Sequence, residues 1–482
     1  MAAEARVKVY QPRPFAPLVW DFLQNHRRCN LWAGMGLGKT SLVETFLDAV
    51  YNLGGESDPT LVLGPLRVAR DVWSSEVLKW AHLQGLTVSV VVGTPAERRA
   101  ALRVKAQVYV TNYDNLVWLE AELAGRPWPF KRIIPDEATR VKNFRLRQGG
   151  VRAKVLGKIA HTAVTDWINL TGTPSPNGLK DLWGQQWFID EGQRLGRTYD
   201  AFERRWFGYK RITDALSKKP GIQPIILPGA QEQIMGRLAD CSLTIDPKDW
   251  FDLQEPLVNV IDVELPEPAR RAYRELERQY LTEIDGCKVE AFNAAAKSMK
   301  LLQLANGAAY LDVNEYGQGE VKGTPKTVEV HDAKLQALES LLEEQNGNPV
   351  LLAYHFKSDL ARIQQAFPHA INVATADGLA RAKRGEGRLW VGHPASMGHG
   401  VDGLQEHCHT ACFFGHWWDL EQWQQFIERI GPVRQMQAGK DRVVTLHYIV
   451  ARDTVDEVVM ARRTSKRAVQ DLLLEHMKGH KR

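Results

Sequence analysis

Short apolar runs alternate with amphipathic stretches in the first part of the chain. The runs predict strands at 60–63, 88–92, 108–110, 132–134 and 167–170. The stretches between them predict helices, for example at 68–80 and 95–102. Apolar strands that alternate with helices are typical of a parallel sheet with helices packed on its faces. The pattern therefore predicts an α/β lobe.

The pattern changes after this lobe. Residues 179–240 are aromatic, basic and mostly helical or irregular, and 218–229 is expected to be a loop. Long helices are expected over 267–283 and 290–306, and the stretch 306–327, rich in glycine and polar residues, predicts a linker. This part of the chain reads as an insert rather than as a second sheet.

The α/β rhythm returns after Asp332. Helices are expected at 334–345 and 454–480. Strands are expected at 349–354, 389–392, 410–414 and 443–449. The simplest architecture is two α/β lobes with a helical insert between them. The expected boundaries are a first lobe over 1–250, with a helical protrusion from about 179, an insert and linker over 251–325, and a second lobe over 326–482.

Composition adds little to this picture. The chain has 482 residues, of which 44% are hydrophobic and 25% charged, as in ordinary globular proteins. A net charge of +5 permits a polyanionic partner. Its five cysteines form no disulfide framework, so we expect a reducing, cytoplasmic environment. No apolar stretch reaches the ~18 residues of a membrane span, and no membrane association is expected.

The strongest chemical signal is the eight-residue stretch from Ala33 to Thr40. It follows an apolar approach and leads into a predicted helix, and it ends in Gly-Lys-Thr. Glycines let backbone N–H groups surround phosphate oxygens, and the helix start adds its positive end. We therefore predict that ATP phosphates bind here, with Lys39 on the β and γ phosphates and Thr40 on Mg²⁺. The backbone contacts are expected from Gly36, Leu37 and Gly38.

Two further groups of polar residues stand at strand ends. Asp136 and Glu137 follow the strand 132–134. Asp136 is expected to hold Mg²⁺ through water, and Glu137 to orient and deprotonate the attacking water. Thr171 and Thr173 flank a glycine at the end of the strand 167–170, and are expected to couple the ATP site to lobe movement.

These three stretches resemble motifs I, II and III of superfamily two helicases. Ala33, which stands in place of the usual first glycine of the phosphate loop, matches the form of the loop in that superfamily. The resemblance is most specific to Swi/Snf-type DNA translocases, particularly compact forms found in phages and mobile elements. Tyr10-Gln11 resembles the upstream glutamine motif, which reads adenine. Further stretches resemble motifs Ia, Ib, IV, V and VI, namely 61–65 with 73–76, 111–114, 351–359, 395–405 and 425–435.

The resemblance implies two RecA-like lobes that bind ATP in their cleft. Gln11 and the backbone around Gly400 would contact the nucleotide, and Gln425, Arg429 and Arg434 would complete catalysis. Thr139 replaces a commoner histidine in motif II. In motif VI, Pro432 stands where the second arginine is usual. Either Arg434 acts with Arg429, which we favour, or Arg429 acts alone and Arg434 is a surface residue.

A basic run follows the acidic pair. We predict that it tracks DNA phosphates, although such a run is often only a solvated face. The residues expected to contact nucleic acid are Thr111 of motif Ib and Arg140, Lys142, Asn143, Arg145 and Arg147 of this run. A group of histidines and cysteines between His399 and His416 resembles a zinc cluster. It lacks a second paired half, so we interpret these residues as core or loop.

The sequence leaves three functions open. The first is a nucleic-acid-stimulated ATPase that uses ATP and Mg²⁺ to move along duplex DNA. The second is a strand-separating DNA or RNA helicase. The third is a nucleotide-gated recruitment module with weak ATPase activity. We expect a monomer, with any targeting supplied by a separate protein or by the insert between about residues 179 and 327.

Overall fold

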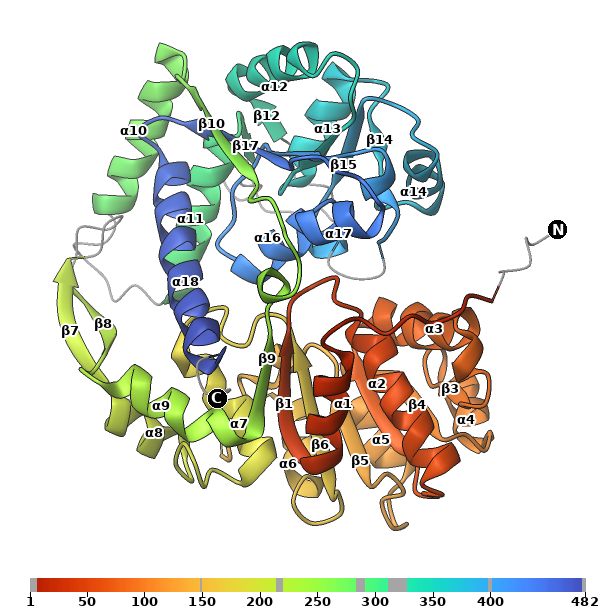
Figure 1. Ribbon diagram of the computed structural model, residues 1–482. Coiled ribbons are helices and arrows are strands. Elements are labelled where there is room, and N and C mark those ends of the chain that lie inside the picture. Colours follow the sequence, from red (N-terminus) through yellow and green to blue (C-terminus); the bar gives the residue numbers. More distant parts are fainter. Residues whose placement is uncertain are drawn as a thin grey trace. The chain divides into compact units, whose positions relative to one another are not determined.

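The computed structural model describes residues 7–147, 150–213, 220–282, 291–310, 327–397 and 401–478. The chain forms two compact units, each described by itself (Figure 1). The first unit contains the chain up to Tyr209, Pro224–Asp252 and the residues from Lys466 onward. The second contains Lys210–Gln223 and Leu253–Ser465.

A parallel sheet forms the centre of the first unit. Its strands, in spatial order, are β3 (Val88–Val90), β4 (Val108–Asn112), β2 (Thr60–Gly64), β5 (Arg132–Pro135), β6 (Asp166–Thr171), β1 (Arg28–Ala33) and β9 (Ser242–Ile245). Each pair of neighbours is parallel. The predicted strands of the first lobe are confirmed. Strand β9 was not predicted; its four residues lie just after the stretch 179–240, which reads as helical or irregular.

Helices connect these strands and cover the sheet. They are α1 (Ala16–Asn25), α2 (Lys39–Asp48), α3 (Trp73–Lys79), α4 (Pro95–Arg103), α5 (Leu116–Glu122), α6 (Val151–Ile159) and α7 (Leu182–Asp190). Strands β2, β4, β5 and β6 are buried along their whole length. Burial on both faces explains why these strands read as continuous apolar runs in the sequence.

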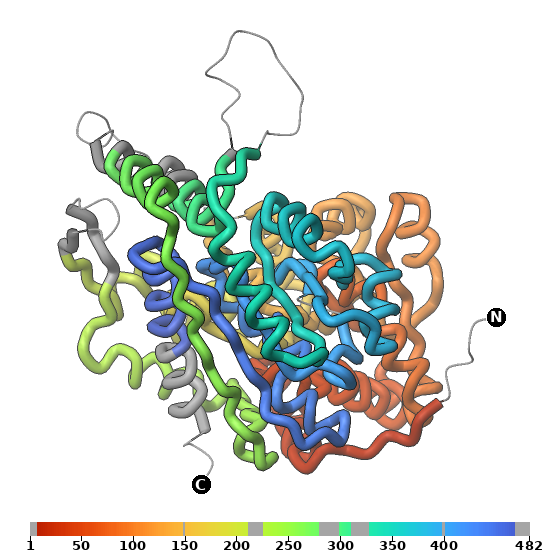
Figure 2. The backbone as a smooth tube through the Cα atoms, turned by 90° about the horizontal axis from the view of Figure 1, so that it is seen from above, coloured from red at the N-terminus to blue at the C-terminus, as the bar shows by residue number. Residues whose placement is uncertain are grey.

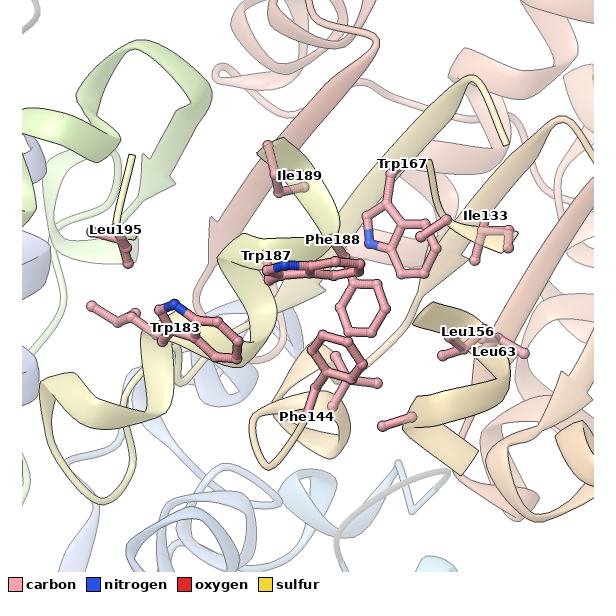
Figure 3. Close-up of a cluster of buried hydrophobic side chains, with 14 of the residues drawn as sticks. Leu63, Ile133, Phe144, Leu156, Trp167, Trp183, Trp187, Phe188, Ile189 and Leu195 are labelled. Atoms are coloured by element: carbon pink, nitrogen blue, oxygen red, sulfur yellow. The ribbon is translucent and has the colours of Figure 1, made fainter. Parts of the chain in front are cut away.

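A cluster of buried aromatic and aliphatic side chains forms part of the core of this unit (Figure 3). Trp167 of β6 stacks on Phe188 of α7, with ring centroids 4.7 Å apart. Phe144 packs against Phe188 and Trp187 at 4.7 and 4.6 Å. Large aromatic side chains bury much apolar surface at low entropic cost. This cluster fixes α7 on the sheet, next to the loop that follows the acidic pair.

The stretch that follows α7 contains helices and a two-stranded sheet. Its elements are α8 (Tyr199–Trp206), β7 (Phe207–Thr213), β8 (Pro220–Ile226) and α9 (Ala230–Leu238). Strands β7 and β8 pair with each other. The expectation of a loop over 218–229 was therefore wrong for β8. Prolines and glycines dominate the local signal there, whereas strand pairing depends on a partner elsewhere in the chain.

A second parallel sheet forms the centre of the second unit. Its order is β10 (Leu257–Val263), β17 (Thr445–Ala451), β16 (Thr410–Phe413), β13 (Val350–Ala353), β15 (Leu389–Gly392) and β14 (Ile371–Asn372). All neighbours are parallel. Two α/β lobes with parallel sheets are thus confirmed. β10 begins soon after residue 250, so this part of the expected insert contributes an edge strand to the second sheet.

The remaining elements of this unit surround its sheet. They are α12 (Ala333–Glu344), α13 (Lys357–Ala366), α14 (Ala376–Lys383), α15 (Pro394–Met397), α16 (Leu420–Ile427), α17 (Pro432–Gln437) and α18 (Val455–Lys478). The helices predicted over 267–283 and 290–306 are α10 (Glu267–Thr282) and α11 (Ala291–Ala305), which pack along each other (Figure 2). The antiparallel pair β11 (Ala308–Tyr310) and β12 (Thr327–Glu329) follows. Most of the predicted linker lies outside the described residues.

A fully buried ion pair fixes the beginnings of two helices in this unit. Lys334 Nζ of α12 lies 2.6 Å from Asp456 Oδ2 of α18. Lys334 also donates to Asn306 Oδ1 and to the Phe414 carbonyl oxygen. The further hydrogen bonds of Lys334 offset part of the cost of burying this charge pair. This network ties α11, α12, β16 and α18 into one lobe.

Candidate nucleotide site and nucleic-acid surface

The predicted phosphate loop connects β1 to α2 in the first unit. Gly36 and Gly38 have φ of 75° and 76°, and Gly38 is the N-cap of α2. Residues other than glycine rarely adopt this left-handed backbone conformation, so the loop favours glycine at these positions. Leu37 between them is fully buried and anchors the loop. The result is a tight turn of backbone leading to a helix N-terminus, the arrangement that binds phosphate.

Lys39 and Thr40 are the first two residues of α2. Lys39 Nζ donates to the carbonyl oxygens of Ala33 at 2.9 Å and Gly34 at 3.4 Å, so the ammonium group lies over the loop. Thr40 is half-buried. Both side chains are therefore placed at the loop itself, as predicted for phosphate and metal binding.

Asp136 follows β5 and is held by several hydrogen bonds. Its N–H donates to the Leu63 carbonyl oxygen at 2.7 Å, and Trp73 Nε1 donates to its Oδ2 at 3.1 Å. Burial raises the pKa of Asp136, an effect that the charge of Lys39 and the bond from Trp73 oppose. The Asp136 carboxylate and the Thr40 hydroxyl are hard oxygen donors, the kind of ligand that Mg²⁺ prefers.

Glu137 is buried and has a left-handed backbone, with φ of 58°. The Tyr113 hydroxyl donates to the carbonyl oxygen of Asp136 at 2.9 Å and lies 3.4 Å from that of Glu137. A non-glycine residue in this conformation persists only where its surroundings hold it, and such residues concentrate at functional sites. Tyr113 was not predicted to have this role, because it lies 23 residues before Asp136.

Thr171 connects Glu137 to the segment that contains Thr173. Thr171 Oγ1 lies 3.5 Å from Glu137 Oε2 and accepts a hydrogen bond from the Thr173 N–H at 3.1 Å. Thr173 is buried, and its hydroxyl has no hydrogen-bond partner among the described residues. The two threonines predicted to couple the site to movement therefore lie directly behind the predicted general base.

The upstream glutamine motif lies before α1. Gln11 is exposed, and Arg13 two residues later reaches the phosphate loop. A Cβ placed on Gly38 would lie 3.9 Å from Arg13 Nε, and the Arg13 guanidinium is 5.9 Å from the centre of the Phe251 ring. Sequence reasoning missed Arg13, since a single arginine in a loop carries no pattern of its own.

The predicted catalytic residues of motif VI lie in the second unit. Gln425 in α16 donates to Glu421 Oε1 at 3.1 Å. Arg429 is buried, and its Nε donates to the Gln425 carbonyl oxygen at 2.9 Å. Arg434 is the third residue of α17, whose first residue is Pro432. Proline is favoured at this position because a first-turn N–H needs no helical partner. Gly400 lies outside the described residues.

The predicted nucleic-acid contacts divide into two groups. Arg140, Asn143 and Arg147 are exposed. Arg145 instead stacks on Tyr199, with its guanidinium carbon 3.4 Å from the ring centre, and donates to the Phe144 carbonyl oxygen at 2.6 Å. Stacking and hydrogen bonding within the lobe give Arg145 a structural role.

Two other candidates are also engaged inside the first unit. Lys142 Nζ lies 3.7 Å from Asp181 Oδ2. Thr111 is buried, and its hydroxyl donates to the Val91 carbonyl oxygen at 2.7 Å. Because this side chain cannot reach a ligand from inside the lobe, we withdraw Thr111 from the nucleic-acid surface.

The histidine and cysteine group contributes to packing. Cys408 and Cys412 are fully buried, and burial raises the pKa of both thiols. His416 shares a 2.8 Å hydrogen bond with the Ile449 carbonyl oxygen. His399 lies outside the described residues. Within the part of the chain that the structure describes, no three such side chains gather as metal ligands would.

Fold and site together define a P-loop protein with two RecA-like lobes. Residues 11–242 match the SNF2-related domain. The phage protein p41 of Acyrthosiphon pisum secondary endosymbiont phage 1 is 52% identical over 474 residues, covering 98% of this chain and all of that protein. Chromodomain-helicase-DNA-binding protein 7 of Gallus gallus is 28% identical over 254 residues, covering 49% of this chain and 8% of that protein.

A solved structure is also similar. It is the SWI2/SNF2 ATPase core of Sulfolobus solfataricus in complex with dsDNA, which is 19% identical with a TM-score of 0.42 and covers 98% of this chain and 95% of that one. The chain belongs to the Swi/Snf-type family of superfamily two, whose members are ATP-dependent motors on nucleic acid. None of its described helices has the length and apolar character that a bilayer span requires.

Proposed function

We propose that this chain is an ATPase that moves along duplex DNA without separating its strands. The observation that carries the proposal is the arrangement in the first unit. There, Lys39 lies over the phosphate loop, its charge acts on Asp136, and Glu137 is held between Tyr113 and Thr171. These are the groups that phosphoryl transfer to water requires.

In the proposed reaction, the loop N–H groups and the start of α2 bind the phosphates of ATP. Lys39 exchanges its contacts with the Ala33 and Gly34 carbonyl oxygens for phosphate oxygens. Thr40 and Asp136 hold Mg²⁺, which neutralises charge on the phosphates when bound. Glu137 accepts the proton of the attacking water, as a general base within hydrogen-bond reach can.

The arginines of the second unit complete the proposed site. Arg429 and Arg434 stabilise negative charge that develops on the transferred phosphoryl group, the role of an arginine finger. Thr171 and Thr173 connect Glu137 to the rest of the first unit, so the state of the nucleotide is transmitted through one short hydrogen-bonded segment. Hydrolysis then depends on lobe closure, as in other enzymes with a closing step.

Duplex DNA is the proposed track. Arg140 and Arg147 are exposed cations in the segment after the catalytic acids, with Asn143 between them. Contacts to phosphates hold a protein on DNA without reading its sequence. The chromodomain-helicase-DNA-binding relatives carry DNA binding in their names.

The test is ATP hydrolysis without nucleic acid and with single-stranded DNA, duplex DNA or RNA. The proposal expects duplex DNA to stimulate the wild-type protein most, and Lys39→Ala to hydrolyse ATP under none of the four conditions. Equal or greater stimulation by single strands or RNA would favour a strand-separating helicase. A weak rate that no nucleic acid raises would favour a nucleotide-gated recruitment module.

A further inference from the structure

The two arginines of motif VI are supported by two consecutive residues. Arg429 donates from one terminal nitrogen to the Val401 carbonyl oxygen at 2.8 Å. Arg434 donates from one terminal nitrogen to Asp402 Oδ1 at 2.5 Å. All four residues belong to the second unit. The short segment 401–402 therefore contacts both guanidinium groups.

Asp402 is itself fixed by its own loop. Its Oδ1 also accepts hydrogen bonds from the Gly403 N–H at 2.8 Å and from Gln405 Nε2 at 3.0 Å. Gly403 has φ of 93°, a conformation that favours glycine and closes the turn beneath the carboxylate. Partial desolvation by its neighbours opposes the charged form of Asp402, but Arg434, Gln405 and the Gly403 N–H together lower its pKa. The carboxylate is thus charged at neutral pH and fixed in direction.

Asp402 holds Arg434 by one terminal nitrogen. The side chain of Arg434 is 16% exposed, whereas that of Asp402 is 64% exposed. Arg434 Nε is buried and has no hydrogen-bond partner among the described residues. A guanidinium has five N–H donors in a rigid plane, so an anchor on one terminal nitrogen leaves donors available for a second anion.

The geometry points to Asp402 as a positioning residue for Arg434. It anchors one nitrogen of the guanidinium and orients the remaining donors toward the γ-phosphate of ATP. The need for such an anchor follows from Pro432, which occupies the usual place of the second arginine and shifts the cation two residues along the chain. This inference rests on the catalytic role proposed for Arg434.

A double-mutant cycle tests it. Asp402→Ala, Arg434→Ala and the double variant are compared for kcat and KM at saturating duplex DNA, and for affinity toward a fluorescent ATP analogue. Misplacement of a catalytic group by about 1 Å costs on the order of 100-fold, so Asp402→Ala is expected to lower kcat by about 10- to 100-fold. KM and analogue affinity stay within about twofold of wild type, because Arg434 acts after binding. In the Arg434→Ala background, Asp402→Ala has no further effect.

Two further variants separate positioning from folding. Asp402→Asn keeps an oxygen acceptor but loses the charge, so its loss of kcat is expected to be smaller than that of alanine. Glu386→Ala removes another acid that pairs with arginines of the same unit, Arg381 and Arg384, and is expected to leave kcat unchanged.

Each result bears on one claim. Wild-type kcat in both Asp402 variants, or equal losses with Asp402→Ala in the wild-type and Arg434→Ala backgrounds, would overturn the positioning role while leaving the proposed ATPase intact. Near wild-type hydrolysis by Arg434→Ala would instead overturn the proposed role of Arg434, and the positioning role with it.

Discussion

The two units contribute to the proposed ATPase in different ways. In the first unit, Asp136 and Glu137 are each held by more than one group of the same unit, and Tyr113 contacts the backbone of both. In the second unit, Arg434 is anchored through one nitrogen to an exposed acid, in a motif whose spacing is altered by Pro432. The comparison teaches that the first set is held by several contacts, whereas Arg434 depends on its contact with a single neighbouring residue.

The largest effect should come from the first set. Glu137→Gln removes the proposed general base while keeping a side chain of the same shape, so hydrolysis should fall by about 10²–10⁴-fold with ATP affinity retained. ATPase rates and titration with a fluorescent ATP analogue measure the two quantities. Glu232→Gln, an exposed acid of the same unit, is the control. An unchanged rate for Glu137→Gln would contradict the assignment.

The arginines of the second unit should show the next largest loss of hydrolysis. Arg434→Ala is expected to lower kcat by about 10³-fold, the lower end of the effect of an arginine finger, with nucleotide binding near normal. Arg429→Ala should in addition reduce stability, because Arg429 is buried and bonded to the Gln425 and Val401 carbonyl oxygens. Thermal unfolding of both variants separates the loss of stability from the loss of catalysis. Equal destabilisation of the two variants would argue against a structural role specific to Arg429.

Salt dependence sharpens the comparison within the basic run. Arg140→Ala and Arg147→Ala should each reduce the slope of log affinity for duplex DNA against log salt by about one, since each removes a phosphate contact. Arg145→Ala should leave the slope unchanged and lower the melting temperature, because Arg145 stacks on Tyr199. Fluorescence anisotropy at several salt concentrations measures the slopes. A change of slope only in Arg145→Ala would reverse the assignment.

The smallest effect concerns a buried acid behind the phosphate loop. Glu44 of α2 is fully buried, neither carboxyl oxygen has a hydrogen-bond partner among the described residues, and burial raises its pKa well above 4.5. The folded protein therefore keeps a proton that the unfolded chain releases above pH 4.5, and stability falls as pH rises through this window. Glu44→Gln should stabilise the protein at pH 8 but not at pH 4.

Thermal unfolding at the two pH values checks this prediction, with Glu232→Gln as an exposed control. A gain in melting temperature that is equal at both pH values would show that Glu44 does not hold the proton. No gain at pH 8 would show that burial of the acid has no net cost.

The sequence predicted the fold, and the tight glycine turn of the phosphate loop, for a physical reason. Buried parallel strands leave apolar runs, and a phosphate loop needs glycines at fixed positions such as Gly36 and Gly38. It could not distinguish Arg140, which is exposed, from Arg145, which is stacked in the lobe, because charge alone does not show what an arginine contacts. It also missed Asp402, whose partner Arg434 lies 32 residues later.

Triplex displacement tests the central claim most directly. A third strand is bound at the end of a duplex DNA, and its release is followed after addition of the protein and ATP. The account predicts ATP-dependent release by the wild-type protein, no release by Glu137→Gln, and no separation of the two duplex strands. Release without ATP, release by Glu137→Gln, or separation of the duplex itself would contradict a motor that moves along intact duplex DNA.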